Sequence, residues 1–567
     1  MLSSDVCKRA TAIAAVEPSR FFRQEDDAER AARILEGWVE IAPHNPVLLD
    51  YDSFEAKGCI DDNWRSLFAS MAWSDAVRRE AISGDQAACR GYTNLLRRIL
   101  CLCDSDKLGI SSVYWKDHPT GVRAAALVAA VSFLGVPEWL QFELERIGDH
   151  LFQRDHYKGW GNHCLMQNSG LLGIGILLAR DDYIATAHAR GFRLLKCSVA
   201  ADGSSTEGSI AYHARLHRWW YEFRQKLQLV DIPLEREWGR ISLMQRFLDY
   251  ATLHDGTICG FGDTALGEVQ PPVVDPDAPR RSADIAAFSA GYLFARSSST
   301  VRQQTYLAAR FGQSFAAAPH GHEDAGTVEW AVGSHRLLTD SGMYGYTQSP
   351  WRTWVKKMNA HNIVTVPSRG YDQDATSTLV RWERSCGHLI ATFDLGTIPR
   401  CQWSRTIIFP LKSAYLLVVD EVKVDEEEQI VQRWNVPDDG HYEVGEAEVT
   451  GHGPSSLRMR WITGEQRLRV VAGWEGNDEY PWVSGWRSNE YGSIHPSPAV
   501  EAIHVGRSWR PAVLFECIPT SYSSVTVSEL FLDDSESSVT FRHERRSTTI
   551  VWSHKSETPG CRGLHDG

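Results

Sequence analysis

Residues 265–284, with the sequence ALGEVQPPVVDPDAPRRSAD, divide the chain into two parts of different hydrophobic periodicity. The stretch contains Pro271, Pro272, Pro276 and Pro279, a composition typical of a linker or a surface excursion. On its N-terminal side apolar residues recur at helical spacing, whereas on its C-terminal side they alternate with polar ones. The sequence therefore predicts a helical part followed by a β part.

The N-terminal side predicts a succession of amphipathic helices, separated by short breaks that contain glycine, proline or aspartate. In residues 26–39, for example, Ala31, Ile34 and Trp38 fall on one helical face. Comparable helices are expected at residues 92–102, 121–134, 168–180, 183–199, 207–227 and 238–253. No repeat of fixed period is visible, but successive antiparallel helices still favour an incomplete (α/α) toroid.

The C-terminal side predicts a long antiparallel sheet system. Alternating stretches occur at residues 305–311, 326–332, 404–409, 414–420, 457–461 and 547–552. The acidic run at 425–428 is interpreted as a solvated hairpin tip between two strands. We therefore predict an α+β multidomain protein: a helical toroid (an incomplete helical barrel) over residues 1–280, an antiparallel β-sandwich over 285–555 and a tail over 556–567.

Composition excludes several classes of protein. The 567 residues include 59 Lys and Arg against 72 Asp and Glu, a net charge of −13 that argues against a nucleic-acid-binding protein. No apolar run approaches the roughly 18 residues that a membrane span needs. The 12 cysteines form no CxxC pair, which indicates reduced thiols. With no leader visible, a cytoplasmic location is expected, and secretion or export to the periplasm is the alternative if a leader was removed.

The first motif is WGNHCLMQN at residues 160–168, where Asn162 and His163 stand at the expected start of a helix. These two polar residues are candidates for a functional role. The alternative is that Asn162 only caps the helix, which local sequence alone favours.

The second motif is DGSSTEGSIAYH at residues 202–213, in which Ser205 or Thr206 is a candidate helix cap. Tyr212 then shares a helix face with Leu216 and Phe223, so packing should hold its ring inward. A buried core tyrosine is the plainer alternative to a catalytic one.

The third motif is HGHED at residues 320–324, followed by LTDSG at 338–342 and by NAHN at 359–362. Histidine and carboxylate ligands on neighbouring strands suit a zinc ion. A polar loop with histidines bonded to the backbone is the alternative, although the three segments together are far more specific than an isolated HxH.

Together these motifs resemble those of the heparinase II/III-type polysaccharide lyases, and the best-matching stretch is residues 320–366. The resemblance implies β-elimination on a uronic-acid polysaccharide or oligosaccharide, in a cleft between the two domains. It assigns charge neutralisation to Asn162 and the acid and base roles to Tyr212 and His320. It also implies a structural zinc site, whose ligands are His322, Asp340 and His361.

Further residues near these motifs are candidates for substrate binding. They are Trp160, His163, Glu207, His213, Arg215 and Arg352. Arg352 belongs to the basic and aromatic stretch SPWRTWVKKMNAHN, which suits a carboxylate or sulfate group. The alternative for that stretch is an ordinary solvated surface.

Two other functions remain open from sequence. A glycoside hydrolase on a helical scaffold would need two carboxylates such as Glu207 and Asp324, but would leave Asn162, Tyr212 and His320 unexplained. A non-catalytic glycan-binding protein, or an accessory protein of exopolysaccharide synthesis, would not need the proposed catalytic set. Heparan, heparin, alginate, hyaluronan and bacterial exopolysaccharides are all compatible substrates, and the sequence is silent on oligomeric state.

Overall fold

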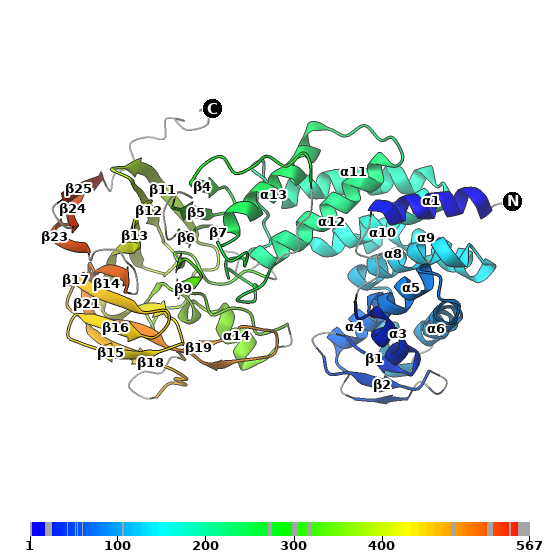
Figure 1. Ribbon diagram of the computed structural model, residues 1–567, viewed down its shortest axis with the longest axis horizontal. Coiled ribbons are helices and arrows are strands. Elements are labelled where there is room, and N and C mark those ends of the chain that lie inside the picture. Colours follow the sequence, from blue (N-terminus) through cyan, green and yellow to red (C-terminus); the bar gives the residue numbers. More distant parts are fainter. Residues whose placement is uncertain are drawn as a thin grey trace. The chain divides into compact units, whose positions relative to one another are not determined.

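The computed structural model (Figure 1) contains two compact units, each assembled from two segments of the chain. The helical unit comprises Met1–Ala201 and Arg215–Ile241, and the sheet unit comprises Asp202–Ala214 and Ser242–Gly567. The structure describes residues 3–16, 25–41, 44–51, 53, 55–58, 60–104, 107–269, 275–297, 304–313, 320–346, 348–477, 483–518, 525–533, 535–543 and 546–553. The predicted tail at 556–567 and two linker prolines, Pro271 and Pro272, lie outside these residues.

Helices dominate the first unit, as the periodicity predicts. Its main helices are α1 (Ser3–Val16), α3 (Asp27–Leu35), α4 (Asp62–Ser70), α5 (Asp75–Ile82), α6 (Gln86–Asp104), α8 (Asp117–Leu134), α9 (Glu138–Phe152), α10 (Asn162–Leu178) and α11 (Asp181–Ser198). Two further helices, α12 (Ile210–Gln228) and α13 (Arg240–Ala251), each contribute residues to both units. The helix predicted at 26–39 is too long, because Gly37, with a φ of +105°, ends it and strand β1 (Trp38–Val39) follows.

The closest helix packing in this unit joins α8 to α10. Both helices are buried on nearly all sides, so neither has the one-sided apolar face of a surface helix. A Cβ atom on Gly121 would lie 2.4 Å from the backbone of Met166, and one on Gly170 would lie 2.8 Å from the carbonyl oxygen of Gly121. Glycine at both positions allows the two backbones to approach, and the packing fixes the start of α10, where Asn162 lies.

The sheet unit is built from antiparallel sheets. A five-stranded sheet has the order β4 (Ile285–Phe288), β5 (Tyr292–Arg296), β6 (Thr305–Arg310), β8 (Val328–Val332), β9 (His335–Leu338). The main path of a twelve-stranded sheet is β15 (His441–Val444), β16 (Glu448–His452), β17 (Leu457–Thr463), β22 (Ala512–Cys517), β14 (Tyr415–Asn435), β13 (Cys401–Pro410), β12 (His388–Asp394), β11 (Thr376–Ser385), β7 (Gly312–Gln313). A separate three-stranded sheet contains β23 (Val525–Phe531), β24 (Glu536–His543) and β25 (Arg546–Ser553).

One apolar core lies between the two larger sheets and makes the sandwich. Leu293 and Trp330 enter it from the five-stranded sheet, while Trp403 and Trp434 enter it from the twelve-stranded sheet. On its other face, the five-stranded sheet is covered by the start of α12 and by α13, whose Phe247 packs against Phe288 and Phe294. Tyr212 is therefore held by a helix start that belongs to the sheet unit.

The predicted hairpin tip at 425–428 is wrong. Strand β14 runs without interruption from Tyr415 to Asn435, and the acidic run lies at a shift of its register against β21 (Ala499–Trp509). A bulge at this point leaves the acidic side chains exposed or half-buried, and Glu428 binds Arg369 at 3.2 Å. Alternation within each flanking stretch cannot distinguish a bulged strand from two strands joined by a turn.

Within the residues that the structure describes, no helix is long and apolar enough to cross a membrane.

Candidate functional site

Tyr212 stands in the first turn of α12, directly after a loop that is locked to a second segment of the sheet unit. The Ser209 hydroxyl accepts a hydrogen bond from the Tyr212 backbone N–H at 3.3 Å and donates one to the Asp263 carbonyl oxygen at 2.8 Å. Gly262, with a φ of +64°, approaches the same loop so closely that a Cβ atom would lie 2.0 Å from the Gly208 carbonyl oxygen. The backbone at residues 208–212 is thus positioned by residues 262–263.

The Tyr212 ring stacks on the His320 ring, with centroids 3.3 Å apart and planes 12° apart. The Tyr212 hydroxyl shares a short hydrogen bond with the Tyr346 hydroxyl, and the Tyr346 ring lies edge-on to both other rings. Tyr346 is held in turn by Tyr491, whose hydroxyl accepts a bond from the Tyr346 N–H at 3.1 Å. Two proton carriers predicted from sequence, a phenol and an imidazole, therefore lie in contact.

The carboxylate of Asp263 lies beneath this pair and is fully buried. One oxygen accepts from His320 Nδ1 at 3.0 Å, and the other accepts from His322 Nε2 at 3.0 Å. Arg352 binds both oxygens, with Nη2 at 2.8 Å from Oδ2 and Nη1 close to Oδ1. One carboxylate thereby joins a predicted catalytic histidine, a predicted metal ligand and a predicted substrate-binding arginine.

Burial and these partners act on the titrating groups in opposite directions. Burial alone would raise the pKa of Asp263, but hydrogen bonds from His320, His322 and Arg352 hold it well below its usual range. Burial lowers the pKa of His320, although Asp263 partly opposes this effect.

Three of the predicted substrate-binding residues lie in the sheet unit and are buried: Glu207, His213 and Arg352. Both ring nitrogens of His213 are engaged, with the Ser205 hydroxyl at 3.0 Å and the Met244 carbonyl oxygen at 3.1 Å. His213 therefore holds the start of α12, and we leave it out of the proposed substrate contacts. Glu207 is also buried, as is Arg352, which lies in helix α14 (Pro350–Lys356) and not on a solvated loop.

The other predicted residues belong to the helical unit. Helix α10 begins at Asn162 and Gly161 is its N-cap, so the alternative that Asn162 caps the helix is wrong. Next to it, His163 is half-exposed and its Nδ1 lies 3.1 Å from Asp117 Oδ1, while the side chain of Trp160 is largely exposed. Arg215 lies on α12, beyond the part of that helix that belongs to the sheet unit.

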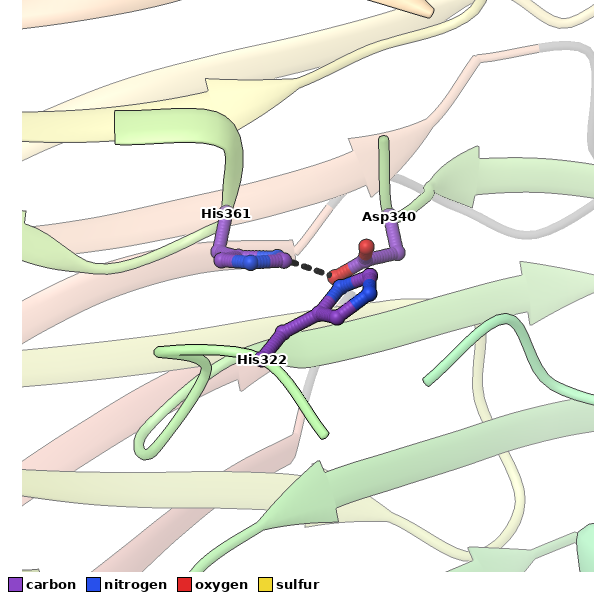
Figure 2. A group of neighbouring side chains, drawn as sticks. All are labelled: His322, Asp340 and His361. Carbon is purple, nitrogen blue, oxygen red and sulfur yellow. Dashed lines mark hydrogen bonds and ion pairs between the residues drawn. The ribbon is translucent and has the colours of Figure 1, made fainter. Parts of the chain in front are cut away.

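The three predicted metal ligands converge in the sheet unit (Figure 2). Each of His322, Asp340 and His361 is buried, and each offers a ligand atom within 4.8 Å of the other two. His361 Nδ1 lies 2.9 Å from Asp340 Oδ2, the contact drawn as a dashed line. The neighbouring Asn362 is also buried and ties the segment down, because its amide donates to the carbonyl oxygens of Val328 and Thr339 at 2.8 Å each.

Two nitrogens in this group give a test of whether a metal ion fits. His322 Nδ1 and His361 Nε2 are buried, and the described part of the chain offers neither a hydrogen-bond partner. A buried polar atom without a partner is costly, and zinc accepts imidazole nitrogen together with carboxylate oxygen. The contact between His322 Nε2 and Asp263 is the outer-sphere bond that metal-bound histidines typically make. The donor set therefore fits a zinc ion.

Comparison with solved structures identifies the class of fold. A solved heparinase III superimposes with a TM-score of 0.76 at 14% identity, over 94% of this chain and 91% of that one. The heparan sulfate lyase HepC from Pedobacter heparinus gives 0.68 at 16% identity, over 94% and 89%. The predicted fold class, an incomplete helical toroid followed by an antiparallel β-sandwich, is confirmed.

The family follows from sequence. Residues 279–558 match the family described as "Heparinase II/III-like, C-terminal", so this C-terminal region belongs to the heparinase II/III-like family, as the motifs suggested. No curated protein matches the chain in sequence.

Asp263 and Tyr346 are two residues of the site that the sequence analysis missed. Asp263 follows Gly262 in an irregular segment after α13, where no periodic pattern draws attention to a single carboxylate. Tyr346 lies in GMYGY, close behind the LTDSG segment, and only the spacing to Asp340 offered a signal. Neither residue is recognisable until the fold brings it to Tyr212 and His320.

Proposed function

We propose that this protein is a polysaccharide lyase that cleaves an acidic, uronate-containing polysaccharide by β-elimination. The observation that carries the proposal is the contact of Tyr212 with His320 in a chain of the heparinase II/III-like family. The sheet unit thus supplies two groups that each exchange a proton, side by side on a rigid support.

The reaction requires two proton transfers. A base removes the proton from C5 of the uronate, the C4–O4 bond breaks, and an acid protonates the departing O4 oxygen while a C4–C5 double bond forms. We assign the two roles to His320 and Tyr212. The hydrogen bond between the Tyr212 and Tyr346 hydroxyls orients the Tyr212 phenol. Either hydroxyl can donate in this bond, so Tyr346 can donate to the Tyr212 oxygen when Tyr212 gives up its proton.

Loss of the C5 proton places further negative charge on a carboxylate, which needs a neutral or positive donor. We assign this neutralisation to Asn162 at the first turn of α10, with His163 beside it. Trp160 is the candidate for stacking on a sugar ring, because its indole is largely exposed.

A zinc ion is proposed at His322, Asp340 and His361 with a structural role. When bound, it would hold the HGHED segment and the NAHN segment together through His322, Asp340 and His361. His320 lies two residues from a ligand, so the order of that segment bears directly on the proposed base.

The test is a panel of uronate polymers, monitored by the ultraviolet absorbance of the unsaturated product. Heparan sulfate comes first, since two of the solved neighbours are a heparinase III and a heparan sulfate lyase. A rise in absorbance that Tyr212→Phe abolishes supports the proposal. Cleavage that yields reducing ends without the double bond would point to a hydrolase, and binding without cleavage would point to a glycan-binding protein.

A further inference from the structure

We propose that Asp263 is a positioning residue that sets the tautomers of two histidines at once. It places the proton of His320 on Nδ1 and the lone pair on Nε2, and it makes His322 present Nδ1 to a metal ion. The kinetic part of this inference rests on the proposed lyase function, whereas its tautomer and metal parts do not.

The argument starts from the partners of the carboxylate. Each oxygen of Asp263 faces one imidazole nitrogen and one guanidinium nitrogen: Oδ2 faces His320 Nδ1 at 3.0 Å and Arg352 Nη2 at 2.8 Å. Oδ1 faces His322 Nε2 at 3.0 Å together with Arg352 Nη1. A guanidinium only donates, and its two-point contact is the geometry of an ionised carboxylate.

A carboxylate held in this way only accepts, so the nitrogen that faces it on each ring must carry a hydrogen. In a neutral imidazole the other nitrogen then carries the lone pair. His320 is thereby protonated on Nδ1 and His322 on Nε2, which are opposite tautomers imposed by one residue.

The surroundings of the other nitrogen of each ring agree with these assignments. His322 Nδ1 is buried, has no hydrogen-bond partner among the described residues, and belongs to the group with Asp340 and His361. The His320 ring lies flat on the ring of Tyr212, the phenol that the proposed reaction uses.

The backbone of Asp263 is held as firmly as its side chain. Its N–H donates to the His320 carbonyl oxygen at 2.9 Å, and its own carbonyl oxygen accepts from Ser209 at 2.8 Å. Asp263 thus connects the segment of His320 to the helix start of Tyr212, and a small displacement would move both groups.

The first experiment records spectra of the wild-type protein and uses variants only to assign the resonances. Histidine is labelled with 15N in the zinc-loaded full chain, and the resonances are assigned by comparison with His320→Gln and His322→Gln. We expect Nδ1–H on His320 and Nε2–H on His322. A proton on Nε2 of His320, or on Nδ1 of His322, would overturn the proposal.

The second experiment replaces Asp263 by asparagine, which has the same shape but one accepting and one donating group. One histidine then loses its acceptor. If it is His322, we expect the zinc dissociation constant to rise by about 10- to 100-fold in a chelator competition. If it is His320, we expect kcat to fall by about 10²- to 10⁴-fold with KM nearly unchanged, because the base is misoriented while the substrate contacts remain.

The matched control is Asp420→Asn. Asp420 is also fully buried and binds Arg405 at two points, each 2.8 Å long, but it contacts no histidine in the described part of the chain. The Asp420→Asn substitution should lower thermal stability without changing the zinc affinity or the tautomers of His320 and His322. Equal loss of zinc affinity in both variants, or unchanged zinc affinity together with unchanged kcat in Asp263→Asn, would refute the inference.

The two proposals can fail separately. If the wild-type protein cleaves none of the tested polymers, the proposed function fails, yet the 15N spectra and the zinc competition still decide the role of Asp263. If Asp263→Asn does not fold, the spectra of the wild-type protein decide it alone.

Discussion

The ring of Tyr212 lies parallel to the ring of His320 at a centroid distance of 3.3 Å. The first residue comes from the start of a helix and the second from the irregular segment before strand β8. The backbone of Asp263 joins the two segments, because its carbonyl oxygen accepts from the Ser209 hydroxyl and its N–H donates to the His320 carbonyl oxygen. The pair therefore depends on three segments that are distant in sequence, and several consequences can be measured.

Replacing Tyr212 by phenylalanine keeps the ring stack but removes the hydroxyl. If the phenol exchanges a proton with substrate, kcat should fall by about 10²- to 10⁴-fold while substrate binding persists. Tyr415→Phe is a suitable control, because the Tyr415 hydroxyl also bonds a histidine, His388 Nε2 at 2.6 Å, within the sandwich. Full activity of Tyr212→Phe would remove this residue from the mechanism.

Tyr346→Phe tests the hydroxyl that partners Tyr212. The phenol of Tyr212 would lose one hydrogen bond and some of its fixed orientation, so we expect a roughly 10-fold fall in kcat, smaller than that of Tyr212→Phe. Steady-state kinetics of both variants and of the double variant give the coupling. Additive effects would show that the two hydroxyls act independently.

Removal of the proposed zinc ion should destabilise the protein before it affects substrate affinity. At a zinc concentration 100 times the dissociation constant, binding stabilises the folded state by about 2.7 kcal/mol. We expect chelation to lower Tm and activity together, and His361→Ala to abolish zinc binding, measured by metal analysis. Should His361→Ala retain the metal as wild type does, the ligand assignment is wrong.

A glycine pair tests the contact that positions the Tyr212 loop. Gly262→Ala places a Cβ atom 2.0 Å from the Gly208 carbonyl oxygen, in addition to a φ of +64°. Gly267→Ala has a similar φ of +82° but meets nothing within 4 Å. We expect the control to lose about 1 kcal/mol and Gly262→Ala to lose about 3 kcal/mol or more, by denaturant unfolding. Equal losses would mean that the loop yields without strain.

The helical unit should carry an acid-sensitive element at His150. Burial lowers the pKa of this histidine from 6.5 to about 4, with the neighbouring His156 adding to the effect. The unfolded chain then binds the proton more readily, so the stabilisation is complete above pH 6.5 and is lost as the pH falls toward 4. His150→Phe, which can keep the ring contact with Trp115, should flatten the dependence of the unfolding midpoint on pH over this interval. An unchanged slope would contradict the assignment.

Much of the architecture could be predicted from local pattern. Helical spacing located α6, α8, α10, α11, α12 and α13, and alternation located strands β6, β8, β13, β14, β17 and β25, because both periods reflect which side of the backbone is buried. The boundaries were less accurate. The helix predicted at 26–39 stopped at Leu35, and the acidic run within β14 was mistaken for a turn.

The sequence by itself also determined which residue types stand ready for chemistry: Tyr212, His320 and the three proposed zinc ligands occur in compact, distinctive segments. Only the tertiary structure decided what surrounds them. Asp263 and Tyr346 are ordinary residues in irregular segments, and hydrogen bonds across the fold bring them to the site. Hydrophobic periodicity indicates which face of a single helix or strand is buried. A functional site brings together residues from distant segments, and their proximity depends on how the whole unit folds.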